Sequence, residues 1–307
     1  MNNNNENLIL YSVIIPHKNI PQLLRRCLDS IPKRNDVQII VVDDNSDSSE
    51  VDFSNFPGVG EFNTEVYFTK EGKGAGYARN LGLEKAKGKW LVFADADDFF
   101  NESFEELMDK YKGSDADLIL FQSNSVDSDS LEPVKSRGKI YNEWYIDSIN
   151  KGNIPDKIRY RIHPPWSKFF SKALIDQYKI RFDEVFTAND AMFSVKSGHL
   201  SKIIIIDLNY LYCSTVRSGS LAMNNDINHF RPRYNVTLNL YKYLKEIGKV
   251  QYRPNIWVLI LYFRKLDKLW IRHFLFPALS TIRLNHLVAD FFRHLNQRFS
   301  HTRKIKR

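Results

Sequence analysis

The sequence predicts an α/β protein: a mostly parallel central sheet with helices on both faces, followed by a region made of helices alone. Three observations support this fold class. Short runs of β-branched apolar residues alternate with stretches whose apolar residues recur at helical spacing, which is typical of βαβ units. Two of the short runs end in clusters of Asp. From about residue 226 the strand pattern stops and only helical spacing remains.

The elements follow one another along the chain. Residues 12–15 form an apolar run that predicts a buried strand, and a helix over 21–31 follows it with Leu24 and Leu28 on one face. Further strands are expected at 37–42, 66–68, 90–93, 117–121, 203–206 and 209–213. Further helices are expected at 75–86, 101–111 and 189–199. The polar, turn-rich stretch 122–160 is predicted to be an excursion over the surface.

Composition sets the class of protein. The chain has 307 residues, of which 43% are hydrophobic and 26% charged. These values exclude a disordered, collagen-like or low-complexity chain, and the length suffices for a substantial core. Cys27 and Cys213 make neither a disulfide framework nor a Cys-x-x-Cys metal site, and the histidines show no zinc-ligand spacing. A reducing, cytoplasmic compartment is the expectation.

Charge divides the chain into two parts. Residues 231–307 hold 17 Lys and Arg against three acids, whereas residues 1–230 hold 27 against 33. We therefore expect an α/β domain over 1–225 and a basic helical region over 226–307. Such a basic region indicates an anionic partner, either nucleic acid or a membrane surface. Because no nucleic-acid-binding module accompanies it, the membrane is preferred and no nucleic-acid partner is expected.

The membrane contact is expected to be peripheral. The start of the chain has no positive region followed by an apolar stretch, so no secretory signal is predicted. The longest apolar runs, 203–206 and 257–263, fall short of the roughly 18 residues that span a bilayer. The expected location is the cytoplasm, with attachment to the inner face of the cell membrane through Trp, Phe, Arg and Lys of the helical region.

Carboxylates follow two of the predicted strands. Asp43 and Asp44 end strand 37–42, and Asp95, Asp97 and Asp98 follow strand 90–93. Ligands of open α/β sheets bind beyond the carboxyl ends of the strands, so these acids are expected to converge on a ligand. A hard cation, Mg²⁺ or Mn²⁺, suits such a cluster. The alternatives are a turn after the first strand and capping by Asp97 or Asp98 of the helix that begins near residue 101.

A glycine-rich segment opens the helix over 75–86. It carries Lys73, Gly76 and Arg79, and backbone N–H groups at a helix start together with Arg favour a phosphate. Its spacing fits neither a dinucleotide-binding fingerprint nor a P-loop. The alternative is a glycine turn with a solvated Arg.

Four motifs stand in order along the first hundred residues. They are Pro16-His17-Lys18-Asn19, Asp43-Asp44-Asn45-Ser46, Gly76-Tyr77-Ala78-Arg79-Asn80 and Asp95-Ala96-Asp97-Asp98. In order and spacing this set resembles the family 2 glycosyltransferases, which have a GT-A fold, invert the transferred sugar and carry a DxD motif. The resemblance is strong over about 10–120 and weaker over 160–225.

The resemblance implies a role for each motif. The uracil side of a UDP-sugar would lie on the first two motifs, the diphosphate near Arg79 and Lys73, and the ribose or sugar near Asp95. Asp97 would coordinate a Mn²⁺ or Mg²⁺ that bridges the diphosphate. The residues it assigns to nucleotide-sugar binding are Pro16, His17, Asn19, Asp43, Asp44, Lys73, Gly76, Arg79, Asp95, Ala96 and Asp97. Arg217-Ser218-Gly219-Ser220 resembles a loop that closes over the diphosphate, with an ordinary turn as the alternative.

The resemblance also implies a catalytic base. The family's Glu-Asp pair corresponds to Asn189-Asp190, so Asp190 would deprotonate the acceptor hydroxyl, with Asp183 or Glu184 as the fallback and a helix cap as the alternative. The segment around Trp166 and Lys168 resembles one that lines the acceptor site. For Trp166 the alternative is packing of its loop against the core.

The expected function is that of a metal-dependent, inverting hexosyl- or N-acetylhexosaminyltransferase. It would move a sugar from a nucleotide sugar, most simply a UDP-sugar, to a glycan or lipid-linked acceptor in bacterial surface polysaccharide synthesis. One alternative is a catalytically inactive binding subunit with the same fold, for which Asn189 is the one hint. Another is a sugar nucleotidyltransferase, whose Gly-rich signature near the first strand is missing here.

Overall fold

The structure is a computed structural model that describes residues 8–135, 138–217, 227–266 and 268–305. The chain falls into two compact units, residues 1–220 and 221–307. The boundary expected near residue 225 and the loop residues Ser218 to Ser220 lie outside the described residues, as do the first residues of the chain.

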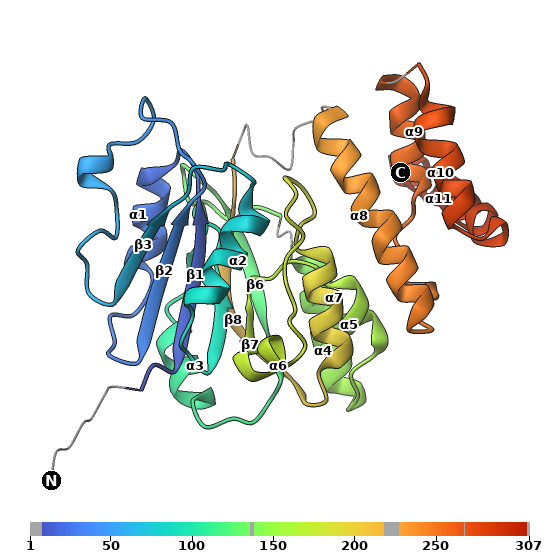
Figure 1. Cartoon of the computed structure of the whole chain (residues 1–307). Coiled ribbons are helices and arrows are strands. Elements are labelled where there is room, and N and C mark those ends of the chain that lie inside the picture. Colours follow the sequence, from blue (N-terminus) through green and yellow to red (C-terminus); the bar gives the residue numbers. More distant parts are fainter. Residues whose placement is uncertain (1–7, 136–137, 218–226, 267, 306–307) are drawn as a thin grey trace, which may run out of the picture. The chain divides into compact units, whose positions relative to one another are not determined.

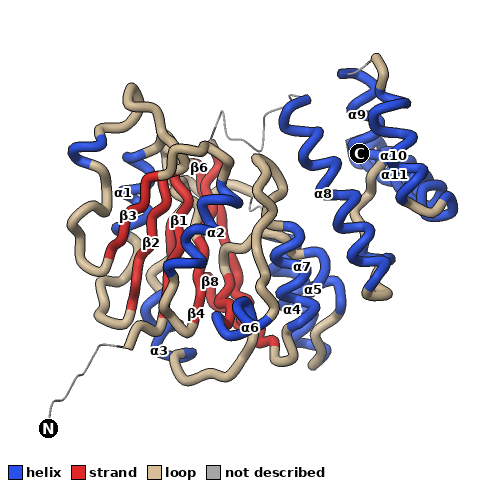
Figure 2. The backbone as a smooth tube through the Cα atoms, viewed as in Figure 1, coloured by secondary structure: helices blue, strands red, loops and turns tan. Residues whose placement is uncertain are grey.

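One sheet organises the first unit, and helices cover both of its faces (Figures 1 and 2). In the described residues its strands pair in the order β3 (Thr64–Phe68), β2 (Val37–Asp43), β1 (Tyr11–His17), β4 (Trp90–Phe93), β7 (Lys168–Ser171), β6 (Leu118–Asp127), β8 (Ile204–Val216) and β5 (Phe99–Phe100). The strands β3, β2, β1 and β4 run parallel to one another. The predicted α/β class and mostly parallel sheet are therefore confirmed.

The parallel register sets the position of the site. His17 at the end of β1 pairs with Asp43 at the end of β2, and Asp43 pairs with Phe68 at the end of β3. Asp95 follows two residues after β4 ends. Carboxyl ends of neighbouring parallel strands meet at one edge of a sheet, so the acidic strand ends converge there as predicted.

Two predictions about the second half of this unit were wrong, and one strand was not predicted at all. Residues 168–171 form that strand, β7, which pairs antiparallel with both β4 and β6. The two strands expected at 203–206 and 209–213 are one strand, β8, which follows β6 through register shifts near Gln122. The surface excursion over 122–160 contains the end of β6 and two helices. Strand β7 and the continuous strand β8 come from pairing across the sheet, which overrides local propensity.

Two sets of helices cover the sheet. Along β1, Val13 and Ile15 face one core cluster with α1 and α3, while Ile14 faces another with α2 and α7. This alternation follows from the two-residue period of a strand. The helices are α1 (Pro21–Asp29), α2 (Ala75–Lys85), α3 (Phe104–Tyr111), α4 (Lys139–Lys151), α5 (Asp156–Arg161), α6 (Lys172–Gln177) and α7 (Ala191–Leu200).

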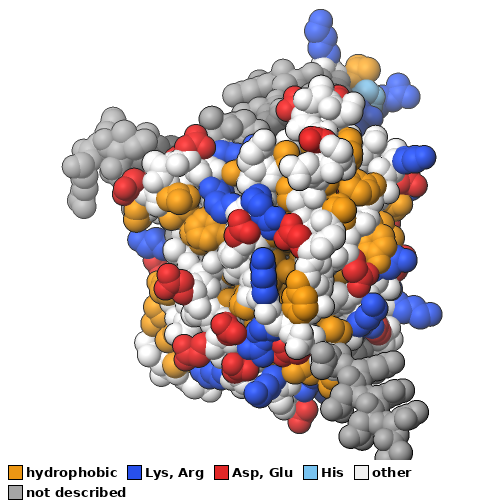
Figure 3. Space-filling view, turned by 90° about the vertical axis from the view of Figure 1, so that its left-hand side faces the viewer, with side chains coloured by type: hydrophobic (Ala, Val, Ile, Leu, Met, Phe, Trp, Pro, Cys, Tyr) orange, Lys and Arg blue, Asp and Glu red, His pale blue; other side chains and the backbone are white. Residues whose placement is uncertain are grey.

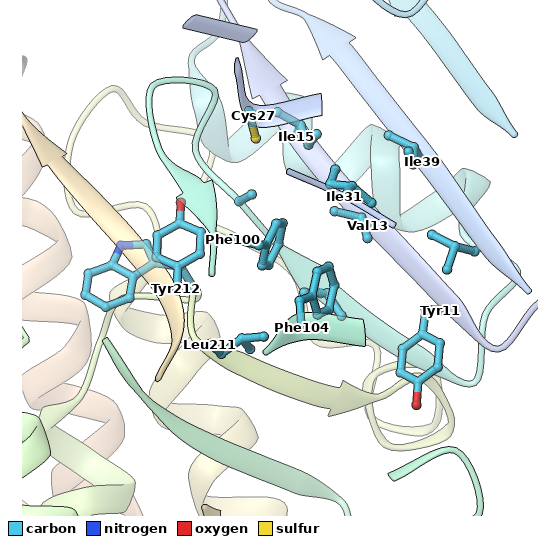
Figure 4. Close-up of a cluster of buried hydrophobic side chains, with 14 of the residues drawn as sticks. Tyr11, Val13, Ile15, Cys27, Ile31, Ile39, Phe100, Phe104, Leu211 and Tyr212 are labelled. Carbon is cyan, nitrogen blue, oxygen red and sulfur yellow. The ribbon is translucent and has the colours of Figure 1, made fainter. Parts of the chain in front are cut away.

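Aromatic rings join β8 to the core on the α1 side. Phe100 stacks on Phe104 at 4.1 Å between ring centroids and meets the ring of Tyr212 edge-on at 5.5 Å. Figure 4 shows these rings with Tyr11 and Leu211 in the buried cluster. Because Tyr212 also reaches the acidic segment after β4, this packing holds that segment in place.

The second unit is helical. Its elements are α8 (Ile227–Glu246), α9 (Trp257–Leu266), a π-helical turn (Ile271–Leu275), α10 (Phe276–Thr281) and α11 (Leu284–Ile305). Buried residues of these helices, including Tyr241, Ile260 and Leu287, form a cluster of their own. In the part of the chain that the structure describes, no helix combines the length and apolar character that crossing a membrane requires.

Candidate active site

A buried hydrogen-bond network joins the ends of the first two strands. His17 is 2% exposed, and its Nδ1 donates to Asp43 Oδ2 at 2.7 Å. The backbone N–H of Ile20 donates to His17 Nε2 at 3.1 Å. The imidazole therefore carries its proton on Nδ1, and both ring nitrogens are engaged inside the protein.

Asp43 is held by further bonds from the next loop. Ser46 donates to Asp43 from its backbone N–H at 2.9 Å and from its hydroxyl at 2.5 Å. Burial by itself raises the pKa of Asp43, but the hydrogen bonds from His17 and Ser46 outweigh it and leave the pKa below its usual range. Asn19, at φ +58°, donates its backbone N–H to Ser46 at 2.8 Å and accepts from the N–H of Asp47. His17, Asp43 and Asn19 thus hold the two loops together, and Pro16 lies buried within β1.

Asp44 is different, because half of its carboxylate has no partner. Oδ2 accepts from the backbone N–H of Gly74 at 2.7 Å, whereas Oδ1 is buried without any hydrogen bond. Burial raises the pKa of Asp44, and Lys18 opposes the rise. Leaving a buried acceptor unpaired is costly, so such an atom marks the place where a ligand's N–H or O–H fits.

Arg79 connects the sheet edge to the second half of the unit. It is 5% exposed; Nη2 donates to Asp95 Oδ1 at 2.5 Å and Nη1 donates to Asn189 Oδ1 at 2.8 Å. Its Nε is buried without a partner. The guanidinium lies 5.3 Å from the ring centroid of Phe182. The sequence motifs around residues 79, 95 and 189 therefore meet in one place.

The acids after β4 take separate roles. Asp98, 3% exposed, accepts from the Tyr212 hydroxyl at 2.9 Å and from the Thr215 N–H at 2.6 Å, so it fixes β8 to this segment. Asp97 is 26% exposed in its side chain and lies 3.3 Å from Arg217 Nε. Burial and the negative charge of Asp95 raise the pKa of Asp97, while the positive charge of Arg217 acts to lower it. Neither acid caps α3, whose N-terminal cap residue, Ser103, makes no capping bond.

The segment 95–97 suits a divalent cation, although no group of three or more His, Cys, Asp or Glu converges as a metal cluster within the described ranges. The Asp97 carboxylate is partly open, and the nearby negative charge of Asp95 disfavours its ionised form. A cation relieves this repulsion, and Mg²⁺ commonly binds one or two carboxylates together with phosphate oxygens. Ala96 between the two acids is buried.

Asp190 stands at the start of α7. It occupies the cap position but makes no side-chain capping bond, so the capping alternative is not realised. Burial raises the pKa of Asp190, while His163 and Arg79 oppose the rise. Burial lowers the pKa of His163, and Asp190 opposes that change in turn. The carboxyl group of Asp190 is therefore influenced by one cationic group, Arg79, and one protonatable group, His163.

The fallback bases lie in the loop before α7. Asp183 Oδ2 is buried without a partner, and burial raises the pKa of this carboxyl group. Glu184 is exposed and accepts from Asn80 at 3.3 Å.

The two predicted acceptor residues are built into the core. Trp166 is 6% exposed and stacks on Tyr212, with ring centroids 5.4 Å apart and planes at 8°. Lys168 is 3% exposed, and its Nζ donates to the carbonyl of Ile162 at 2.9 Å. Both belong to the segment that enters β7, so sheet pairing draws them inward. Trp166 thus packs its segment against the core, as the alternative had it, and acceptor contact by Trp166 and Lys168 stays a prediction.

The glycine-rich segment is shaped by close packing. A Cβ on Gly76 would lie 2.1 Å from the carbonyl oxygen of Asp183, so only glycine lets α2 approach the loop before α7. Lys73 is exposed, with Nζ 4.8 Å from the ring centroid of Tyr77. Gly76 therefore positions the site through packing, and Lys73 leaves its charge at the surface.

An open cavity of about 1110 Å³ is bordered by the start of α1 and residues 48–57. It contains none of the predicted site residues. Figure 3 shows the left-hand face of Figure 1, where acidic, basic and apolar side chains are mixed without a broad patch of one charge. We assign no ligand to this cavity.

Sequence reasoning missed several supporting residues. Tyr212 binds Asp98 and accepts the backbone N–H of Asp95 at 2.9 Å. Arg26 donates to the carbonyl of Asp97 at 2.7 Å, and His163 neighbours Asp190. These partners lie tens of residues from the motifs they serve, and no local spacing signals them.

Comparison with known proteins agrees with this geometry. The model of the family described as Glycosyl transferase family 2 matches residues 12–178. The glycosyltransferase GlyA of Streptococcus pneumoniae is 28% identical over 223 residues, covering 69% of this chain and 31% of GlyA. The poly(ribitol-phosphate) beta-glucosyltransferase of Bacillus spizizenii is 26% identical over 245 residues, covering 77% of this chain and 36% of that protein. The chain thus spans about a third of the length of each of these relatives.

A solved structure shares the fold. S. aureus TarS 1–349 in complex with UDP-GlcNAc superposes with a TM-score of 0.63 at 20% identity, covering 86% of this chain and 79% of that one. This likeness confirms the fold expected from the sequence motifs. Because the family model matches more than half of its residues, the chain belongs to glycosyl transferase family 2.

Proposed function

We propose that this protein transfers a sugar from a UDP-sugar to a glycan or lipid-linked acceptor, with inversion and with help from a divalent cation. The observation that carries the proposal is Asp44 Oδ1, a buried acceptor without a partner at the carboxyl edge of the sheet. Family membership and the UDP-GlcNAc held by TarS support the donor class.

The unpaired oxygen of Asp44 suits a nucleobase that presents an N–H. Uracil has such a donor at N3, whereas cytosine has an acceptor there, so the carboxylate favours UDP over CDP. The neighbouring backbone is held rigid by the network of His17, Asp43 and Ser46. A rigid network keeps the acceptor in place before the nucleotide arrives.

The diphosphate would lie between Arg79 and Asp97. Arg79 is bound by one carboxylate, that of Asp95, and by the neutral amide of Asn189. Its positive charge is therefore only partly compensated, and it would attract the leaving diphosphate. Asp97 would hold a Mn²⁺ or Mg²⁺, which would supply further positive charge for the leaving diphosphate. Arg217 neighbours Asp97 at 3.3 Å and would stabilise the departing diphosphate from the other side.

Asp190 would act as the base. Inverting transfer needs one group that removes the proton from the acceptor hydroxyl on the face opposite the leaving diphosphate. Burial raises the pKa of Asp190, which makes its carboxylate a stronger base. His163 and Arg79 act in the opposite direction, because they favour the ionised carboxylate. Asn189 orients Arg79 beside it.

The acceptor is a glycan or a lipid-linked sugar in surface polysaccharide synthesis. One relative is named as a poly(ribitol-phosphate) beta-glucosyltransferase, and another is named as a glycosyltransferase. The transferred group would be a hexose or N-acetylhexosamine. The basic helical region would hold the enzyme at an anionic membrane surface on the cytoplasmic side, where lipid-linked acceptors are found, and no nucleic acid takes part.

Calorimetric titration with UDP and CDP, with Mn²⁺ or with EDTA, tests the proposal. Wild type should bind UDP with Mn²⁺, bind CDP far more weakly, and lose UDP affinity with EDTA or in Asp97→Ala. In Asp44→Asn the amide oxygen must accept the hydrogen bond from the Gly74 N–H, and the NH₂ group then points toward the base. We expect UDP affinity to fall about 10- to 100-fold, from the loss of a hydrogen bond to a charged group.

The control is Asp115→Asn, because the Asp115 side chain is 95% exposed. Its UDP affinity should equal that of wild type. Asp190→Asn should also bind UDP normally while losing sugar transfer by about 100-fold or more. Equal affinity of wild type and Asp44→Asn for UDP would overturn the nucleobase assignment, and normal transfer by Asp190→Asn would overturn the base.

A further inference from the structure

Helix α11 keeps an apolar stripe in the open. Leu284, Val288 and Phe292 are 68%, 46% and 58% exposed. Residues four apart lie on successive turns of one helix face, so these three side chains form a continuous stripe. A neighbouring face of the helix is also apolar, because Leu287 is 1% exposed and belongs to the core of the second unit. The core does not account for the outer stripe.

The preceding helix shows the same feature. On α10, Phe276 and Leu279 are 59% and 43% exposed, whereas Ala278 between them is fully buried. A large aromatic side chain thus faces outward while a small one fills the core. Soluble surfaces carry scattered apolar residues, but a run of them on two consecutive helices marks an interaction surface.

The charges around the stripe have one sign. The one acid between residues 268 and 294 is Asp290, which is 1% exposed and bound by Arg253 at 2.7 Å and by Arg293. Lys268, Arg272 and Arg283 are exposed. The open surface of this stretch therefore offers apolar groups and cations without an acid between them.

We infer that the stripe Leu284–Val288–Phe292 of α11 lies in the surface of an anionic lipid bilayer, with α10 beside it and Lys268, Arg272 and Arg283 on the lipid headgroups. An apolar stripe on α11 with cations in the segments that precede it fits this partner, because the acyl region takes the apolar side chains and the headgroups take the cations. The inference rests on the membrane contact of the proposed function and specifies which residues make it.

Other occupants fit less well. A nucleic acid would pair with the cations and leave the apolar stripe in water. A second copy docked through the same face would bring cations of one sign together at a two-fold interface. The lipid surface alone satisfies both groups.

Sedimentation of the full chain with vesicles tests the inference. Vesicles of phosphatidylcholine alone are compared with vesicles of phosphatidylcholine and phosphatidylglycerol in equal parts. Wild type should bind the anionic vesicles, and less so at high salt. The double variant Leu284→Gln/Phe292→Gln should bind about tenfold or more weakly, from the loss of two apolar groups. Glutamine is a good helix former, so α11 should persist.

The matched control is Phe62→Gln, at a side chain 51% exposed in the first unit, which should bind vesicles like wild type. UDP binding by the double variant, measured calorimetrically, should stay at the wild-type value, which separates this inference from the proposed donor site. Equal vesicle binding by wild type and the double variant, or equal binding to neutral and anionic vesicles, would overturn the inference. So would a wild-type dimer that the double variant converts to monomer.

Discussion

Lys168 is the residue whose environment departs furthest from its predicted role. The side chain belongs to β7 and is buried, and its Nζ donates a hydrogen bond to the carbonyl of Ile162. Burial lowers the pKa of Lys168 to about 7, and Asp190 opposes the change. An ammonium group needs solvation that this position does not supply, so the folded protein favours the neutral amine.

The consequence is a pH-dependent stability. Between about pH 7 and the usual pKa near 10.5, the unfolded chain binds a proton at Lys168 that the folded chain does not. The free energy of unfolding therefore rises with pH in this window, by up to about 1.4 kcal/mol per pH unit. Lys168→Met lacks this contribution, so urea unfolding at about pH 7.5 and 8.5 should show a shallower rise for the variant. Identical slopes would mean that the amine stays protonated beside Asp190.

At the scale of elements, the contact between α2 and the loop before α7 assembles the site. Gly76 allows this contact, because a Cβ there would lie 2.1 Å from the carbonyl oxygen of Asp183 and 3.0 Å from the Cβ of Asn189. The loop carries Asn189, the partner of Arg79, and leads into Asp190. One glycine thus allows the two segments that carry Arg79 and Asn189 to meet.

Gly76→Ala should push the loop away from α2. We expect a loss of about 1–3 kcal/mol in the free energy of unfolding, from overpacking, and a marked loss of sugar transfer as Asn189 and Asp190 move. Gly113→Ala is the control, because a Cβ at Gly113 meets nothing within 4 Å. Urea unfolding and transfer assays on both variants check this. A Gly76→Ala protein that is as stable as Gly113→Ala would show that the loop yields without cost.

At the scale of the whole molecule, each unit has a core of its own. The sheet unit contains two clusters of buried apolar residues, both within residues 11–212, and the helical unit contains a third within 234–287. Cooperative unfolding follows the boundaries of such cores. The two units are therefore stabilised by separate hydrophobic cores.

Scanning calorimetry should resolve two unfolding transitions. UDP with Mn²⁺ should raise the melting temperature of the transition that belongs to the sheet unit, because a ligand stabilises only the unit that binds it. Leu287→Ala, in the core of the helical unit, should lower the other transition at a cost of about 2–5 kcal/mol. A single transition that both changes move together would contradict two independently folding units.

The parallel half of the sheet was predictable because its signals are local. Residues 39–42 and 90–93 are continuous apolar runs, and the acids that follow them indicate the edge where a ligand is expected. The start of helix α2 was predicted correctly, because a glycine precedes it, and its end was predicted to within one residue. Strand β7 was missed because four residues with a Lys at the first position carry no strand signal. Its identity comes from pairing with β4 and β6, more than 40 residues away.

The sequence by itself determined the α/β class, the acidic strand ends, the family motifs and the separate basic helical region, because each depends on residues close together in the chain. Only the tertiary structure decided how those residues divide the work. It turned Asp43 and Asp98 into structural anchors, left Asp44 with an open oxygen, and buried Trp166 and Lys168. The reason is physical: whether a polar group is free for a ligand depends on which partners folding brings beside it, and those partners come from distant parts of the chain.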